Sequence, residues 1–157
     1  MADLLEFLPA VRAGAKLPGG VYKSERHFLD FLVNGNSLWE RSGKHHDMVS
    51  VFCREFAMEQ TRRAVGRLLL NEEADFPDDR RALLICSECG DLGCGAISIL
   101  VVKDRDCVVW KAFGYENTYD NHVKLSDYAD VGPFAFDAAA YQALLSGAVK
   151  HLYQGGA

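Results

Sequence analysis

Residues 95–113 read GAISILVVKDRDCVVWKAF and form the most regular pattern in the chain. Two runs rich in apolar and β-branched residues, Gly95–Lys103 and Cys107–Phe113, flank a polar turn at Lys103–Asp106, which is typical of a β-hairpin. Apolar side chains fill successive positions of the first run, so both faces of its pleat are apolar. Such a strand lies inside a sheet, so we expect Gly95–Lys103 at the centre of an antiparallel sheet.

Three more segments have the composition of extended chain. His27–Val33 is rich in Phe, Leu and Val and ends at Asn34-Gly35, a pair that suits a two-residue type I′ turn. Ala82–Cys86 is a compact apolar run that predicts a strand. Met48–Phe52 alternates weakly, so it is either a strand or the lead-in to a helix.

Three segments read as helical. In Met58–Leu70 the apolar positions recur on one face and the arginines on the other. A longer pattern follows Asp137, whose carboxylate is a good N-cap, with apolar positions at Tyr141, Leu144, Leu145, Ala148 and Leu152. The first eleven residues, MADLLEFLPAV, read as a short amphipathic turn of helix.

Hairpin strands and segregated helices together predict an α+β fold. We expect a single domain over residues 1–157, in which an antiparallel sheet is packed by two main helices. Glycines and Pro18 loosen Ala13–Gly20, which we predict to be a flexible segment.

The 157-residue chain has the composition of a soluble globular domain, with 49% hydrophobic and 25% charged residues. Its formal charge of −5 argues against a nucleic-acid partner, which needs a dense basic face. The longest apolar run, Ala96–Val102, is far shorter than the roughly 20 residues that cross a bilayer. Because Asp3 and Glu6 stand where a signal peptide would be basic, we expect a cytoplasmic protein with no membrane partner.

A cysteine motif, CSECGDLGCG at residues 86–95, joins two predicted strands. Cys86 and Cys89 have the spacing of a zinc knuckle, and Cys94 could add a third thiolate. A closed zinc site needs a fourth ligand, and the residues of suitable chemistry are Cys107, Cys53 and His122. A metal site is therefore one interpretation of the motif, with half of the usual ligand pattern missing.

Two other interpretations of these cysteines remain open. A Cys-x-x-Cys pair can form a catalytic disulfide when a helix N-terminus lowers the pKa of its first thiol, although no helix is predicted after this pair. Alternatively, the thiols pack as small apolar groups in a glycine-rich connection. The odd number of five cysteines argues against a complete disulfide framework.

The cysteine motif also carries a resemblance. CSECGDLGCGA, the following Val-Val-Trp strand and FGYEN at residues 113–117 resemble a family of small uncharacterised bacterial proteins with a CxxCGDLGCG motif. FAFDAAAY at residues 134–141 is similar as well, so the resemblance covers roughly residues 82–117 and 134–145. Where the family has a proline after the first cysteine, this chain has Ser87. Proteins of this kind resemble immunity proteins encoded beside contact-dependent or polymorphic bacterial toxins, which implies a binding function and no specific activity.

Acidic residues are concentrated in the second half of the chain. Residues 1–67 carry a formal charge of +2, and residues 68–157 carry −7. Five carboxylates lie in one loop after the first predicted helix: Glu72, Glu73, Asp75, Asp78 and Asp79. Such a run is either a solvated connector or a surface that attracts a basic partner and rejects acidic competitors.

The segment Gly114–Asp137 mixes aromatic and acidic residues, which is the composition of interface hot spots. It is also long for a connection. The residues that we predict at an interface are Tyr115, Glu116, Tyr119 and Asp120. The alternative is that the rings of this segment cover the sheet edge and complete the core.

One cluster has side chains suited to catalysis: His45, His46 and Asp47. Neighbouring residues of a strand point to opposite faces, so we expect the two imidazoles not to converge and favour a polar loop. The chain contains no GxxxxGK[ST], GxSxG or HExxH motif. We therefore assign no catalytic residue.

These observations favour a non-catalytic immunity protein, an antitoxin that binds and neutralises a basic toxin domain such as a nuclease through the acidic and aromatic surface. The alternative is a small zinc-binding or thiol-redox protein built on Cys86, Cys89 and Cys94.

Overall fold

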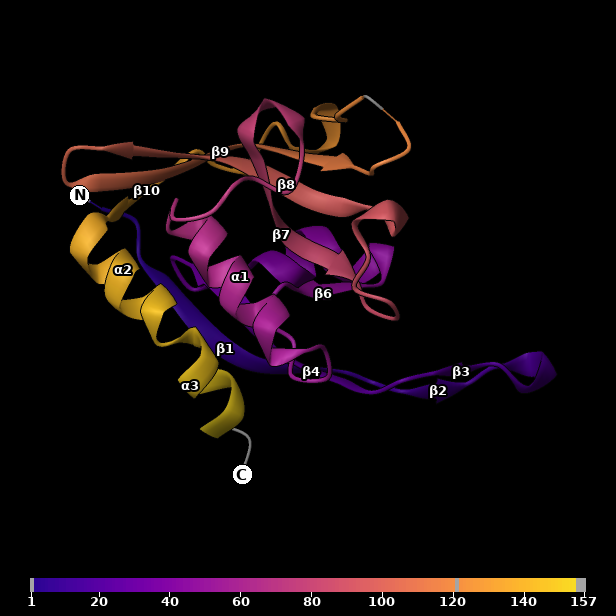
Figure 1. Cartoon of the computed structure of the whole chain (residues 1–157). Coiled ribbons are helices and arrows are strands. Elements are labelled where there is room, and N and C mark those ends of the chain that lie inside the picture. Colours follow the sequence, from indigo (N-terminus) through magenta and orange to yellow (C-terminus); the bar gives the residue numbers. More distant parts are fainter. Residues whose placement is uncertain (1, 121, 155–157) are drawn as a thin grey trace.

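The computed structural model describes residues 2–120 and 122–154 and has the expected α+β fold (Figure 1). A five-stranded antiparallel sheet has the order β10-β9-β8-β7-β6, and a three-stranded sheet has the order β1-β4-β5. The strands are β1 (Leu5–Arg12), β2 (Ala15–Lys16), β3 (Tyr22–Lys23), β4 (Arg26–Val33), β5 (Asn36–Ser37), β6 (Met48–Ser50), β7 (Arg80–Cys86), β8 (Ala96–Asp104), β9 (Cys107–Glu116) and β10 (Phe134–Asp137). The helices are α1 (Met58–Leu68), α2 (Ala138–Ser146) and α3 (Ala148–Gln154).

The predicted hairpin is confirmed as β8 and β9. Ala96 of β8 lies opposite Glu116 of β9 at one end of the pairing, and Asp104 lies opposite Cys107 at the other. β8 is the central strand of the larger sheet. The register shifts between Ser98 and Leu100, where Ala112 of β9 has a φ of 54°. This β-bulge turns the Ala112 carbonyl group towards the buried Arg80 side chain, which donates to it at 2.6 Å.

The other extended segments are also confirmed. Asn34 and Gly35 have φ angles of 53° and 81° and join β4 to β5, as a type I′ turn requires. Met48–Phe52 contains a strand, β6, which pairs with β7 along the edge of the larger sheet.

Two helix predictions are wrong in part. Within the described residues 2–11 the chain has no helical turn and enters β1 at Leu5, because Leu5–Arg12 pairs with β4 along its whole length and this pairing outweighs local preference. The helix after Asp137 is confirmed with its N-cap, since the carboxylate accepts from the Ala140 amide at 2.9 Å. It is divided into α2 and α3 at Gly147, whose ψ of 2° is not helical.

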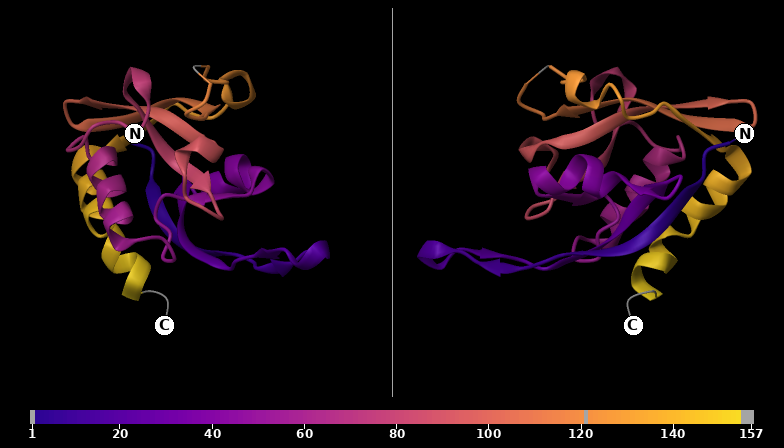
Figure 2. Two further views of the ribbon diagram at one scale, coloured as in Figure 1. Left: turned by 45° about the vertical axis from the view of Figure 1, so that its right-hand side comes forward. Right: turned by 180° about the vertical axis from the view of Figure 1, so that it is seen from behind.

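A thin two-stranded ribbon, residues 12–26, projects away from the body of the molecule (Figures 1 and 2). In this ribbon, Ala15 and Lys16 of β2 lie opposite Lys23 and Tyr22 of β3. Ala13–Gly20 therefore forms one strand and the tip of this ribbon, and its flexibility stays a prediction.

The core joins both sheets to the helices around Trp110, which is fully buried. Its ring meets Phe31 and Phe136 edge-on, with centroids 5.5 and 5.0 Å away. Its indole N–H donates to the Tyr141 hydroxyl at 3.1 Å, and that hydroxyl donates to the Leu68 carbonyl at 2.7 Å. None of the helices in residues 2–120 and 122–154 combines the length and hydropathy that a membrane crossing needs.

Candidate functional site

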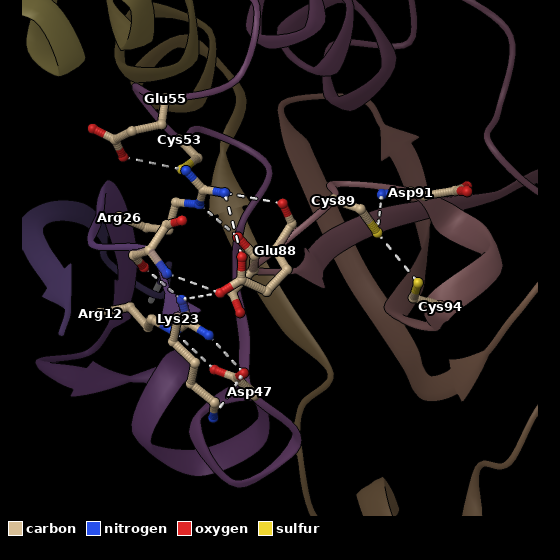
Figure 3. Close-up of polar contacts among 12 residues, drawn as sticks. Arg12, Lys23, Arg26, Asp47, Cys53, Glu55, Glu88, Cys89, Asp91 and Cys94 are labelled. Atoms are coloured by element: carbon tan, nitrogen blue, oxygen red, sulfur yellow. Dashed lines mark hydrogen bonds and ion pairs between the residues drawn. The ribbon is translucent and has the colours of Figure 1, made fainter. Parts of the chain in front are cut away.

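Three cysteines converge in the loop between β7 and β8, which we call the knuckle (residues 86–95). Cys86 ends β7, and Cys94 closes a 3₁₀ turn just before β8. The sulfur atoms of Cys86, Cys89 and Cys94 all lie within 4.8 Å of one another. Figure 3 shows the side chains of Cys89 and Cys94, whose sulfurs are 3.2 Å apart. The predicted thiol cluster is thus present, and its donor set suits a thiophilic metal ion.

The knuckle backbone holds this arrangement by itself. The Gly90 amide donates to the Cys86 carbonyl at 3.0 Å, with Gly90 at a φ of 65° that a side chain would strain. The Asp91 amide donates to the Cys89 sulfur at 3.4 Å, and the Asp91 carboxylate accepts from the Gly93 amide at 2.9 Å. The turn therefore brings the sulfurs together through local hydrogen bonds.

The pKa values of Cys86 and Cys94 are shifted in opposite directions. Burial raises the pKa of Cys86, but hydrogen bonds from the backbone amides of Cys89 and Glu88 outweigh it, so this pKa lies below its usual value. Hydrogen bonding to Cys89 and the charge of Cys86 raise the pKa of Cys94 to about 12. Binding of a cation would require all three sulfurs to be deprotonated.

The candidates for a fourth ligand lie elsewhere. Cys107 pairs with Asp104 at the far end of β8, about 27 Å along the strand from Ala96. Cys53 is fully buried, and burial raises the pKa of its thiol to about 11. Within residues 2–120 and 122–154, the possible metal ligands that lie close together are the three knuckle cysteines alone. His122 is therefore not close enough to be the fourth ligand.

The base of the ribbon is clamped to the knuckle (Figure 3). The Glu88 carboxylate accepts from the Arg12 guanidinium at 2.9 Å and from the Ser24 amide at 3.0 Å. Arg26 donates to the carbonyls of Ser87 and Glu88 at 2.7 and 2.9 Å. The residues between Cys86 and Cys89 thus link the knuckle to both strands of the ribbon.

Asp47 completes this clamp. Its carboxylate accepts two hydrogen bonds from Arg12, at 2.9 and 2.8 Å, and lies 3.2 Å from the Lys23 ammonium group. The Arg12 guanidinium holds the pKa of both Asp47 and Glu88 below the ordinary range. Arg12 and Arg26 lie opposite each other in the β1–β4 register, a relation that is visible only once that pairing is known.

The expectation that the imidazoles of His45 and His46 do not converge is wrong, whereas the polar loop is confirmed. They lie on a 3₁₀ turn and not on a strand, so their rings approach to 4.2 Å between centroids. His46 Nε2 lies 3.1 Å from the Tyr128 hydroxyl. The pKa of His46 is lowered mainly by burial and to a smaller extent by the charge of His45. With Asp47 engaged by Arg12, these residues do not form an imidazole–carboxylate pair.

The acidic loop is divided between surface and interior. Glu72, Glu73, Asp78 and Asp79 are exposed. Asp75 is turned inward, where it accepts from the Ala82 amide at 2.9 Å and lies 3.1 Å from Arg67, and burial raises its pKa. Asp75 therefore supports the loop and does not contribute a free carboxylate to its surface.

The aromatic and acidic segment is divided in the same way. Tyr119 is 84% exposed and Asp120 is exposed, whereas Tyr115 is half-buried. Glu116 is buried at 5% exposure, with its carboxylate 2.9 Å from Arg80, so it is not an interface residue. Tyr128 and Phe136 are buried as well, so these two rings complete the core as the alternative predicted.

The two acidic segments meet at one cavity of about 260 Å³. Asp78 comes from the loop before β7, and Asp120 comes from the connection after β9. Neither carboxylate has an ion-pair partner within the part of the chain that the structure describes. Glu72 and Glu73 line a separate cavity together with Arg63 and Arg67, and Asp79 pairs with Arg81 at 2.9 Å. We therefore call only Asp78, Tyr119 and Asp120 the acidic face.

Comparisons with family models, curated proteins and solved structures found no match for this chain.

Proposed function

We propose that this chain is a non-catalytic immunity protein that binds and neutralises a cognate basic toxin domain in the cytoplasm. The observation that carries the proposal is the cavity at which Asp78 and Asp120 meet, because it joins two acidic segments that are far apart in sequence. A joined surface attracts a positive partner more strongly than two separate patches of the same charge.

The side chains on this surface suit a nuclease-type toxin. A nuclease cleft must be positive to hold phosphate, so carboxylates without internal partners would take the place of its substrate. Tyr119, at 84% exposure, adds a ring of the kind that anchors protein interfaces. All five cysteines are free thiols, which supports a reducing compartment such as the cytoplasm.

We expect Asp78→Lys/Asp120→Lys to weaken binding to the protein encoded by the adjacent gene by about 100-fold, since like charges across an interface cost several kcal/mol. Isothermal titration calorimetry on the two purified proteins measures this affinity. The matched control is Asp104→Lys/Asp106→Lys, which makes the same charge change at exposed positions of the distant β8–β9 turn and should change affinity less than about 3-fold. Equal losses in the two variants, or no complex at micromolar concentration, would remove the proposal.

A second candidate is a zinc-binding protein, favoured by the convergence of Cys86, Cys89 and Cys94. Its test is the metal content of protein that was purified without chelator. One zinc per chain supports this candidate, and a content near zero after exposure to zinc excludes it. The thiol-redox version is tested by partner binding after all three cysteines are changed to serine.

A further inference from the structure

We propose that Cys86, Cys89 and Cys94 bind one zinc ion whose fourth coordination position is open to a neutral nitrogen ligand from outside the chain, such as an imidazole. This inference rests on the zinc-binding candidate. It adds the number of protein ligands and the chemical class of the external one.

The sulfur positions are compatible with one tetrahedral ion. A zinc–sulfur bond of about 2.3 Å places two sulfurs of a tetrahedron about 3.8 Å apart. All three sulfurs lie within 4.8 Å of one another, and those of Cys89 and Cys94 are 3.2 Å apart, so each pair needs a shift of at most about 1 Å to reach that separation. Small changes in the side-chain torsions of Cys89 and Cys94, both exposed, would complete three bonds without moving the knuckle backbone.

The fourth position would face solvent. Cys86 is partly buried at the end of β7, whereas Cys89 and Cys94 are exposed, so the side of an ion away from β7 would be open. Three protein ligands with one exchangeable position is the pattern of zinc sites that act on other molecules, while structural sites use four protein ligands.

Nearby groups that could close the site are already engaged. The Glu88 carboxylate is held by Arg12 and Ser24 on the ribbon side of the knuckle, away from the sulfurs (Figure 3). The Asp91 carboxylate caps the Gly93 amide, and His46 Nε2 is bonded to the Tyr128 hydroxyl. In the described ranges, no fourth His, Cys, Asp or Glu ligand atom joins the cluster.

Charge selects the class of external ligand. Three thiolates on Zn²⁺ leave a net charge of −1, and the exposed Asp91 beside Cys89 adds to it. An anionic fourth ligand from outside would add to this negative charge, whereas a neutral imidazole would not, so the charge favours imidazole over a free anion. The Tyr119 ring lies against Gly93, next to Cys94, so the open position borders the acidic face, where a partner's histidine could reach it.

Cobalt(II) tests the proposal, because it replaces zinc in thiolate sites and its visible absorption reports the ligand set. We expect the reduced full-length chain to bind one Co²⁺ with a tetrahedral spectrum, and added imidazole to shift that spectrum at millimolar concentration. Azide, which is an anion, should need at least a 10-fold higher concentration than imidazole to shift the spectrum. Cys89→Ser should weaken Co²⁺ binding by about 100-fold or more, while Cys107→Ser, a cysteine outside the cluster, should change it less than 3-fold.

The outcomes distinguish a failure of the zinc-binding candidate from a failure of the open fourth position. If neither Co²⁺ nor Zn²⁺ binds with the expected dependence on Cys89, both the zinc-binding candidate and this inference fail. If Co²⁺ binds but imidazole leaves its spectrum unchanged, the site is closed by the protein and only the open position fails. His122→Ala should leave the Co²⁺ spectrum as it is, and a changed spectrum would identify His122 as the closing ligand.

Discussion

Glu116→Ala is expected to lower the free energy of unfolding by about 3–5 kcal/mol, because it leaves the charge of Arg80 buried without its partner. The two side chains are each about 6% exposed and their ion pair is 2.9 Å long. Arg80 also donates to the hydroxyl and carbonyl of Ser98, at 3.0 and 2.9 Å, and these bonds do not supply a negative charge. Urea unfolding followed by tryptophan fluorescence measures the loss, since Trp110 lies in the core.

Two variants make this result interpretable. Glu73→Ala removes an exposed carboxylate and should change stability by less than about 0.5 kcal/mol. Arg80→Met/Glu116→Leu replaces both charges and should be more stable than Glu116→Ala alone, because no unpaired charge remains. A loss of less than 1 kcal/mol in Glu116→Ala would contradict the assignment of this pair as a buried support beneath the acidic face.

Arg12→Ala should release the ribbon from the knuckle and lower the free energy of unfolding by about 1.5–3 kcal/mol. The Arg12 side chain is 6% exposed and joins Asp47, Glu88 and the Ser24 carbonyl. Hydrogen exchange of the ribbon amides should accelerate at least 10-fold, since their protection depends on this clamp. Arg63→Ala is the matched control, because its pair with Glu59 is exposed on α1 and should contribute less than about 0.5 kcal/mol.

The pH dependence gives an independent check on Arg12. Because Arg12 lowers the pKa of Asp47 and Glu88 below their ordinary values of 3.8 and 4.5, their contribution is present above those values and is lost as the pH falls through the lowered ones. The difference in stability between the parent and Arg12→Ala should therefore be largest near neutral pH and shrink below about pH 4. A difference that is constant from pH 7 to pH 3 would show that packing, and not these two ion pairs, accounts for the effect.

The sequence predicted the elements whose signals are local. The β8–β9 hairpin, the turn at Asn34-Gly35 and the N-cap at Asp137 each depend on residues that are neighbours in the chain. The convergence of the three knuckle cysteines is local in the same sense, because one glycine-rich turn contains all of them. Local spacing restricts backbone geometry directly, so these features could be predicted without knowledge of the fold.

Long-range pairing decided the remaining features. Leu5–Arg12 forms a strand because β4 lies beside it, and that same pairing places Arg12 and Arg26 at the base of the ribbon, against the knuckle. Composition assigned Asp75 and Glu116 to a surface, whereas packing turned both inward against arginines. Charge counts measure only how many carboxylates a segment carries. The direction of each side chain depends on contacts between segments that are distant in sequence, and so does the position of Asp78 and Asp120 at one cavity.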